Sequence, residues 1–147
     1  MNTTIEKFGY PETLVHEYEH WVVLLRGQQV TLGSLVLACK EQALSFSTIS
    51  SAASTELSQA VSDVESVLSA TFSDDKINYL MLMMVDPHVH FHVLPRYSSA
   101  QKFNDREFAD GAWPGPPDLG TSHAISAAEF ATLATTLRSR WPSQRNK

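Results

Sequence analysis

Residues 83–97 read MMVDPHVHFHVLPRY, and within them His88, His90 and His92 occupy every second position. These three are half of the six histidines in the chain. Because side chains of a β-strand point alternately to its two faces, the three imidazoles share one face and the apolar residues between them share the other. A strand rises about 3.4 Å per residue, so the outer two histidines lie about 14 Å apart. The stretch predicts a strand that carries a line of imidazoles on one face.

Apolar runs elsewhere in the chain predict the other strands of a sheet. Residues 77–85 are apolar on both faces, as in a strand within a covered sheet, and their methionines are expected in the core. Only Asp-Pro separates this run from the histidines, so the two strands should be antiparallel neighbours. Residues 20–26 and 30–38 form two further runs, and the Gly-Gln-Gln between them suits a hairpin turn. Another short strand is expected in residues 13–20 or after Arg96.

Two segments have the spacing of amphipathic helices. In residues 52–72 the apolar side chains recur mostly at intervals of three and four, which predicts a helix with one apolar face despite its many serines. A second helix begins after Ser126, which forms a capping box with Glu129, and Pro142 ends it. Residues 98–122 are polar and rich in proline and glycine, and we expect them to form a long loop.

The predicted order of elements is two strands, a helix, two strands, a loop and a helix. This order indicates an α+β fold, in which two main helices pack on an antiparallel sheet. With 147 residues and 43% hydrophobic content, the chain is expected to form one domain, residues 1–147. Residues 98–147 extend this domain as a loop and a C-terminal helix.

Charge and composition restrict the partners. A formal net charge of -5 argues against general binding of nucleic-acid polymers, which depends on Lys and Arg, but leaves room for a small anionic ligand. Cys39 is the single cysteine, which excludes an internal disulfide and a multi-thiolate zinc cluster. No segment has the roughly 18–20 apolar residues of a membrane span, and the N-terminus has no apolar run of signal-peptide type. We therefore expect a cytoplasmic protein without a membrane partner.

Three kinds of role fit a row of histidines. In the first, they simply lie on the polar face of a half-exposed strand. In the second, His88 and His90 bind a metal ion, since an H-x-H pair on a strand is a common element of zinc and iron sites. Such a site needs a third ligand, but no carboxylate follows the pair until Asp105, and the next histidine beyond the stretch is His123. In the third, a histidine attacks a phosphate.

The third role matches the chemistry of imidazole. A neutral imidazole is a good nucleophile near pH 7, because its unperturbed pKa is about 6.5. Attack on a nucleotide α-phosphate forms a P–N bond that water later breaks, which divides one displacement into two easier ones. The attacking ring must be held in one tautomer, and neighbouring imidazoles can donate hydrogen bonds to phosphoryl and leaving-group oxygens. A line of imidazoles on a straight strand follows a phosphate chain better than it surrounds one ion.

The segment HVHFHVLPR, residues 88–96, resembles the motif of the histidine triad (HIT) family, His-φ-His-φ-His-φ-φ, where φ is an apolar residue. The surrounding hairpin, helix and apolar strand are similar as well, over roughly residues 15–97. The continuation VLPR resembles the dinucleoside-polyphosphate hydrolase branch, the fragile histidine triad-like one, more than the phosphoramidase branch. The resemblance implies a five-stranded antiparallel sheet and a homodimer that joins the sheets of both subunits. It also implies nucleotidyl hydrolase or transferase chemistry.

The same resemblance implies roles for the three histidines. His90 would be the nucleophile, and His92 would contact the phosphate or the bridging oxygen. His88 would help to position the central ring, partly through its backbone carbonyl. The substrate would be a small-molecule nucleotide. The motif requires no cofactor or bound metal, and a divalent cation that arrives with the substrate is compatible with it.

Other positions depart from the family pattern. Ser34 stands where the family often has a fourth histidine, and Arg26 stands near an asparagine that often lies close to the ribose or phosphate. Arg96 follows the triad, where it is either within reach of a phosphate or an ordinary exposed arginine. These three are the candidate nucleotide- and phosphate-binding residues. The MMVDP before the triad is shorter than the Gly-rich segment common in the family, and we expect its Asp86 to cap the turn.

The leading hypothesis is a hydrolase or nucleotidyl transferase that acts at an α-phosphate through a nucleotidylated His90. Its substrate would be a dinucleoside polyphosphate or a nucleotide phosphoramidate. One alternative is a nucleotide-binding sensor or adaptor with weak catalysis, because the fourth histidine is missing and the segment before the triad is short. The other is a metal-dependent hydrolase that uses His88 and His90.

Overall fold

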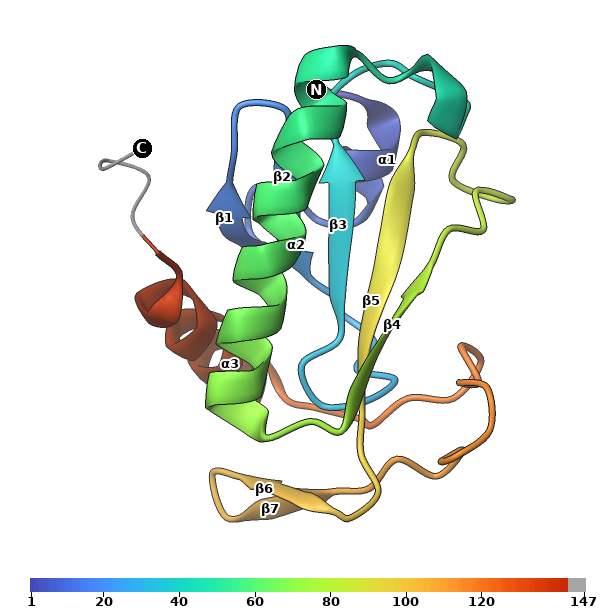
Figure 1. Cartoon of the computed structure of the whole chain (residues 1–147). Coiled ribbons are helices and arrows are strands. Elements are labelled where there is room, and N and C mark those ends of the chain that lie inside the picture. Colours follow the sequence, from blue (N-terminus) through green and yellow to red (C-terminus); the bar gives the residue numbers. More distant parts are fainter. Residues whose placement is uncertain (143–147) are drawn as a thin grey trace.

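The computed structural model of the chain describes residues 1–142 and shows an α+β fold (Figure 1). Five strands form one antiparallel sheet in the order β1-β2-β3-β5-β4. They are β1 (Leu14–Glu17), β2 (Trp21–Leu25), β3 (Leu35–Cys39), β4 (Lys76–Leu80) and β5 (His90–Arg96). The helical elements are α1 (Thr3–Lys7), α2 (Ser51–Phe72), α3 (Ala127–Arg140) and the short 3-10 helix η1 (Phe46–Thr48). The predicted fold class, with α2 and α3 as its main helices, is confirmed.

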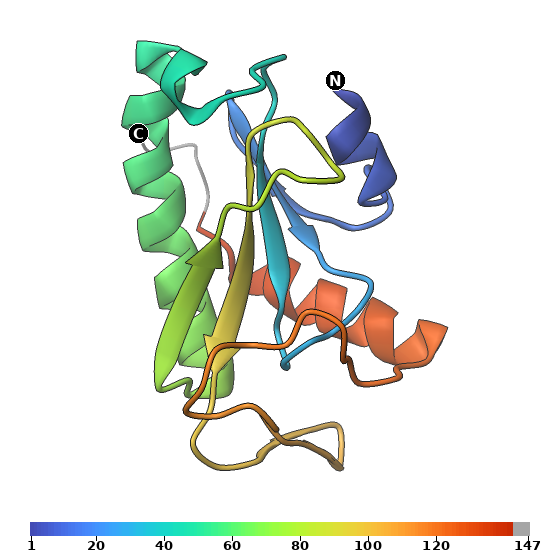
Figure 2. The same cartoon turned by 90° about the vertical axis from the view of Figure 1, so that its right-hand side faces the viewer.

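Helices lie against both faces of the sheet. α2 runs along one face and α1 lies against the other, so the strands stand between the two helices in Figure 2. The main hydrophobic core lies on the α2 side and includes alternate residues of β2, such as Trp21 and Val23, together with Leu133 of α3. A smaller core surrounds Ile5 of α1 on the other side. Its sheet residues are Val22, Leu24, Val36 and Ala38.

Local capping groups define the ends of the two main helices. α2 starts after Ser50, whose hydroxyl caps its first turn, and ends before Ser73, which has a left-handed backbone conformation with φ of 57°. α3 starts with the capping box between Ser126 and Glu129 and stops just before Pro142. Both helices are confirmed where the sequence predicts them. No helix within residues 1–142 has both the length and the apolar character that crossing a membrane requires.

The predicted strand at residues 77–85 is too long. β4 ends at Leu80, and residues 81–89 form a loop that leads into β5. Met83 has a positive φ of 53°, so the backbone after Leu80 leaves the extended conformation that a strand requires. Met81 and Met83 pack against the core as expected, but Met84 is 87% exposed, so its assignment to the core is wrong.

The connection between β2 and β3 is also longer than predicted. β3 begins at Leu35 instead of residue 30, and residues 26–34 form an irregular loop in place of a tight turn. The fully buried Gln29 organises this loop, because its side-chain amide donates to the carbonyls of Arg26 and Ser34. Its side-chain oxygen accepts the N–H of Gly33. A buried glutamine that satisfies three backbone groups stabilises the irregular backbone, and the apolar run alone does not reveal it.

Additional strands occur in both places where a further strand was expected. β1 lies within residues 13–20 and pairs with β2. After Arg96, β6 (Gln101–Phe103) and β7 (Arg106–Phe108) form a small separate hairpin inside the segment predicted as a loop. Most of the rest of residues 98–122 is irregular, as predicted. Of the single domain predicted for residues 1–147, residues 143–147 lie outside the described part.

Candidate active site

β5 carries the central and last histidines of the triad. His90 pairs with Ala38 of β3 and His92 pairs with Val36, which places both imidazoles on the face covered by α1. Their ring centroids are 5.1 Å apart, and the rings are nearly perpendicular. His88 precedes the strand, in the loop after β4. The predicted common strand therefore holds for two of the three histidines.

All three histidine side chains are more buried than side chains on the exposed face of a strand. The exposed fractions are 9% for His88, 1% for His90 and 7% for His92. Part of this cover comes from Phe8, directly after α1, whose ring centroid lies 5.5 Å from that of His90 and 5.8 Å from that of His92. The arrangement does not match a half-exposed strand that merely carries histidines. It matches a covered polar site.

The backbone of His88 fixes the protonation of His90. Nδ1 of His90 lies 2.7 Å from the carbonyl oxygen of His88. A carbonyl only accepts, so Nδ1 carries the proton and Nε2 keeps its lone pair. Within residues 1–142 no buried side-chain nitrogen or oxygen lacks a hydrogen-bond partner. Because the hydrogen bond of the His90 ring is made by Nδ1, the small exposed part of this side chain includes Nε2. The lone pair of Nε2 is therefore not used by a hydrogen bond within residues 1–142.

His92 has the opposite tautomer. Nε of Arg26 donates to its Nδ1 over 3.5 Å, so Nε2 of His92 carries the proton and acts as a donor. Burial, followed by the positive charges of Arg26 and of a protonated His90, lowers the pKa of His92 to about 4, although Asp86 acts in the opposite direction. Burial also lowers the pKa of Arg26. At neutral pH the site therefore holds a neutral His92 beside a charged guanidinium.

Ser34 does not take the place of a fourth imidazole. Its side chain is fully buried, accepts the N–H of Thr31 and donates to the carbonyl of Thr31 at 2.7 Å. The hydroxyl thus closes the loop between β2 and β3 instead of pointing a free donor at the triad. Its contacts do not support the predicted phosphate-binding role.

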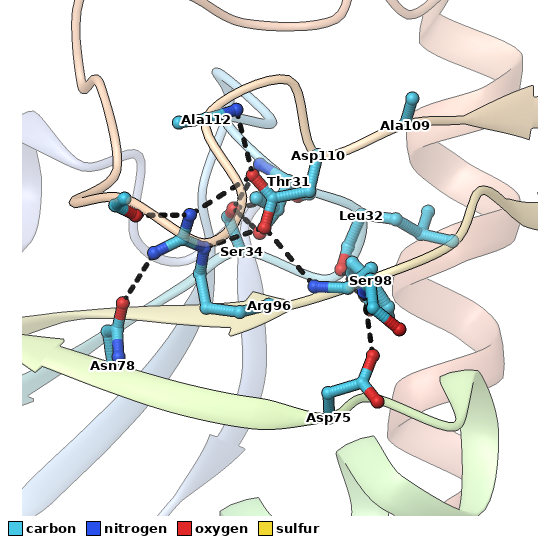
Figure 3. Close-up of polar contacts among 12 residues, drawn as sticks. Thr31, Leu32, Ser34, Asp75, Asn78, Arg96, Ser98, Ala109, Asp110 and Ala112 are labelled. Atoms are coloured by element: carbon cyan, nitrogen blue, oxygen red, sulfur yellow. Dashed lines mark hydrogen bonds and ion pairs between the residues drawn. The ribbon is translucent and has the colours of Figure 1, made fainter.

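Arg96 holds the late loop onto the sheet. Its guanidinium forms a two-fold contact with the carboxylate of Asp110, at 2.7 and 3.2 Å, and also donates to Asn78 and to the carbonyl of Gly115 (Figure 3). Arg96 is only 4% exposed. Its three nitrogens are all engaged, so the contacts of Arg96 do not support the predicted phosphate-binding role either. Among the three candidates, the structure brings Arg26 to the triad and leaves Ser34 and Arg96 in structural contacts.

Asp86 does not serve mainly as the predicted turn cap. Its carboxylate forms an ion pair of 2.7 Å with Lys7 of α1, which connects the loop before the triad to the N-terminal helix. Within residues 1–142, no three His, Cys, Asp or Glu side chains are grouped as a metal ion would require.

The sequence reasoning missed the contribution of α1 to the site. Thr4 contacts the ring of His88, and Phe8 packs against the other two histidines. The local signal for this helix is Asn2, whose side chain accepts the N–H of Ile5, followed by apolar residues three apart. That signal predicts a short helix but not its partner, because Thr4 and His88 are 84 residues apart.

Two opposed imidazole tautomers on a covered sheet face define a candidate site for nucleophilic attack by histidine. The family model of the HIT domain matches residues 8–99 of the chain. The chain belongs to the HIT family. None of the curated proteins matches its sequence.

Solved structures of HIT proteins have the same fold. A histidine triad protein from Bradyrhizobium japonicum gives a TM-score of 0.74 at 19% identity and covers 96% of each chain. One from Marinobacter aquaeolei gives 0.74 at 18% identity, covering 96% of this chain and 94% of that one. A hypothetical histidine triad nucleotide-binding protein from Sulfolobus tokodaii gives 0.66 at 17% identity, covering 87% and 82%. These likenesses show the fold. They do not support the assignment to the dinucleoside-polyphosphate hydrolase branch, which VLPR favours.

Proposed function

We propose that the protein is a nucleotide hydrolase or nucleotidyl transferase in which His90 attacks the α-phosphate of the substrate. The HIT domain suggests nucleotide-binding and hydrolase or transferase activity in general. The observation that carries the proposal is the 2.7 Å hydrogen bond between Nδ1 of His90 and the carbonyl of His88, which leaves Nε2 as the atom that can attack. The substrate class is a dinucleoside polyphosphate or a nucleotide phosphoramidate.

In the first step Nε2 of His90 forms a P–N bond to the α-phosphorus, and the bond to the leaving group breaks with its electron pair. A nucleotide leaves as its anion, whereas an amine takes up a proton from water. The ring of His90 becomes positively charged, and the His88 carbonyl at its Nδ1–H stabilises that charge. His92, whose Nε2 carries a proton, donates a hydrogen bond to a phosphoryl or bridging oxygen.

In the second step water attacks the phosphorus, the electron pair of the P–N bond returns to His90, and a proton passes to solvent. Another acceptor in place of water makes the protein a transferase. The Arg26 guanidinium beside His92 adds positive charge near the developing phosphoryl charge. Neither step uses a metal ion, and a divalent cation bound to the phosphates of the substrate would be compatible with both.

Two finer parts of the proposal rest on the family resemblance. VLPR after the triad favours a dinucleoside polyphosphate over a phosphoramidate as the substrate. The homodimer would join two sheets through a free edge, and β4 is an edge strand of the sheet. A molar mass measured by light scattering at twice that of the 16.3 kDa chain would agree with a dimer, and the mass of one chain would refute it.

A nucleotide-binding sensor with weak catalysis is the second candidate. It is favoured by Ser34, whose hydroxyl bonds to Thr31 and so does not replace the missing histidine as a donor to the triad. A sensor binds the nucleotide with measurable affinity but forms little covalent intermediate. The two candidates therefore differ in the amount of nucleotidylated protein.

The deciding experiment measures covalent labelling. Purified protein is mixed with diadenosine polyphosphate labelled at the α-phosphate, and acid-labile label on the protein is counted for wild type, His90→Ala and His20→Ala. We expect label on wild type and on His20→Ala, since His20 lies outside the triad, and none on His90→Ala. Label on His90→Ala would refute the nucleophile. Binding without label or turnover would favour the sensor, and activity lost to a chelator and restored by zinc would favour a metal-dependent hydrolase.

A further inference from the structure

A charged pair joins the N-terminal helix to the loop that precedes the triad. Nζ of Lys7, in the last turn of α1, lies 2.7 Å from Oδ1 of Asp86. Figure 2 shows the loop between β4 and β5 reaching from the sheet toward α1. Lys7 lies just outside the segment that matches the HIT domain, and the steps proposed for His90 do not use the pair.

The helix holds the backbone of Lys7 in a fixed place. Asn2 caps α1 and donates its side-chain amide to the carbonyls of Cys39 and Glu41, both at 2.9 Å. Ile5 is fully buried in the smaller core. The side chain of Lys7, in contrast, is 56% exposed. Its ammonium is therefore accessible to a dissolved anion from the end of a helix that is anchored to the sheet.

The pair lies at the rim of the candidate site. Phe8 follows Lys7 directly, and its ring centroid is 5.5 Å from that of His90 and 5.8 Å from that of His92. Burial lowers the pKa of His92 and the charge of Asp86 acts to raise it, so the carboxylate is close enough to interact with the ring. In the proposed mechanism His92 donates to a phosphoryl or bridging oxygen. Lys7 is therefore a cation near the reacting phosphate.

The two substrate classes of the proposed function differ in their leaving groups. A dinucleoside polyphosphate releases a nucleotide with a charged phosphate chain, whereas a phosphoramidate releases an amine. A carboxylate as near as that of Asp86 repels a phosphate chain unless a cation compensates it. Lys7 supplies that charge, and its ammonium has three N–H donors, which one contact with Asp86 does not use up.

We infer that Lys7, held at the rim by Asp86, binds the phosphate chain of the leaving group and so selects dinucleoside polyphosphates over nucleotide phosphoramidates. The inference rests on the proposed function, in which a P–N bond forms at Nε2 of His90 while the bridging P–O bond breaks. The electron pair of that bond stays on the terminal phosphate of the leaving nucleotide. Lys7 keeps its proton and donates hydrogen bonds to this phosphate. An amine leaving group offers the ammonium no such anion.

The first test measures binding without turnover. The affinity for inorganic tripolyphosphate is measured by isothermal titration calorimetry in wild type, Lys7→Met and Lys7→Arg. We expect Lys7→Met to bind about 10-fold more weakly, because a charge-assisted hydrogen bond is lost, and Lys7→Arg to bind like wild type. Lys7 is on the surface, so these variants should fold. Equal affinities of wild type and Lys7→Met, or no binding to wild type, would overturn the inference.

The matched control removes another lysine from an ion pair. Nζ of Lys40 lies 2.8 Å from the carboxylate of Glu17 in β1, which β2 and β3 separate from β5. Lys40→Met changes the net charge as Lys7→Met does, but we expect its affinity for tripolyphosphate to stay within about 2-fold of wild type, since distant exposed charges are screened. Equal weakening in both variants would show that net charge controls binding, and would also overturn the inference.

The second test compares the two substrate classes. For Lys7→Met we expect kcat/KM to fall by about 10-fold with diadenosine tetraphosphate and to stay within about 2-fold with adenosine 5′-phosphoramidate, while Lys7→Arg restores the first value. Equal losses on both substrates, or turnover of the phosphoramidate alone by wild type, would refute the selection. If wild type turns over neither, the proposed function fails, while the tripolyphosphate result still decides whether Lys7 binds a phosphate chain.

Discussion

At the scale of single residues, His92 shows how its neighbours set the state of an imidazole. Burial and the adjacent Arg26 lower its pKa to about 4, so the ring is neutral throughout the physiological range. The Arg26 donor at Nδ1 leaves the proton on Nε2. A neutral ring with a fixed N–H can donate a hydrogen bond from Nε2, whereas Nε2 of His90, two residues earlier, keeps its lone pair. Two identical residues of one strand thus have opposite tautomers.

The low pKa of His92 predicts a pH dependence of stability. The unfolded chain takes up this proton near pH 6.5 and the folded chain near pH 4, so the unfolded state binds more protons between these values. Stability therefore falls as the pH drops from 6.5 to 4, by on the order of 3 kcal/mol from this group, and the group has no effect above pH 7. Chemical denaturation of wild type and His92→Gln across this range checks it, since only wild type has this contribution.

The same ring can be titrated directly by NMR. Arg26→Met removes the neighbouring positive charge, so the pKa of His92 should rise but stay below 6.5, because burial is the larger cause of the shift. A smaller loss of stability between pH 6.5 and 4 in Arg26→Met should accompany this change. If the titration of His92 is the same in both proteins, the contact between the two side chains does not exist in solution.

At the scale of elements, the loop between β2 and β3 depends on Gly33. This residue has a φ of +88°, and a Cβ placed on it would lie 2.7 and 2.9 Å from ring carbons of Phe72, the last residue of α2. Its N–H also donates to the buried side chain of Gln29. The loop therefore packs against α2 at a point where a side chain has neither the space nor the backbone conformation it needs.

Gly33→Ala should lower the free energy of unfolding by about 1–3 kcal/mol from backbone strain alone, and by more if Phe72 cannot move. Gly27→Ala, in the same loop, is the matched control, because no atom lies within 4 Å of its added Cβ. We expect that variant to stay within about 0.5 kcal/mol of wild type. Chemical denaturation measures both. Equal stabilities of the two variants would mean that Gly33 does not hold this conformation in solution.

The elements differ in how far the sequence predicts them. The helices at 52–72 and after Ser126 were predicted correctly because their apolar spacing and caps are local. The ends of β3 and β4 were predicted wrongly because they depend on distant partners. β4 ends at Leu80, shortly before the positive φ of Met83, and the start of β3 depends on the burial of Gln29. An apolar run does not say which neighbours a strand will have.

At the scale of the whole molecule, the candidate site also has parts that the local sequence predicts and parts that depend on distant partners. Strand alternation places His90 and His92 on one face, and this could be inferred from their spacing. The contacts of Thr4 and Phe8 with the triad could not be inferred, because they join the first residues of the chain to β5 and to the loop before it. Arg96 looked equally suited to bind phosphate or to face solvent, and only the folded chain brings it to Asp110.

The pair of Arg96 and Asp110 fastens the loop after β7 to the sheet. Both side chains are nearly fully buried, at 4% and 3% exposure. Burial alone would raise the pKa of Asp110, but the hydrogen bonds and charge of Arg96 and the N–H groups of Tyr97 and Ala112 outweigh it, so the pKa is lowered. The carboxylate is therefore charged at neutral pH. Among these contacts, only the guanidinium of Arg96 carries a compensating positive charge.

Arg96→Met should lower the free energy of unfolding by about 3–5 kcal/mol, because it leaves the buried Asp110 carboxylate without its cation. Adding Asp110→Leu in the same chain should recover much of that loss, since an apolar pair of similar volume can replace a buried ion pair. Denaturation of the single and double variants measures this coupling. Nucleotide affinity of the double variant then separates structure from binding. We expect it to equal that of wild type, whereas a phosphate-binding Arg96 would require weaker binding even in the restabilised protein.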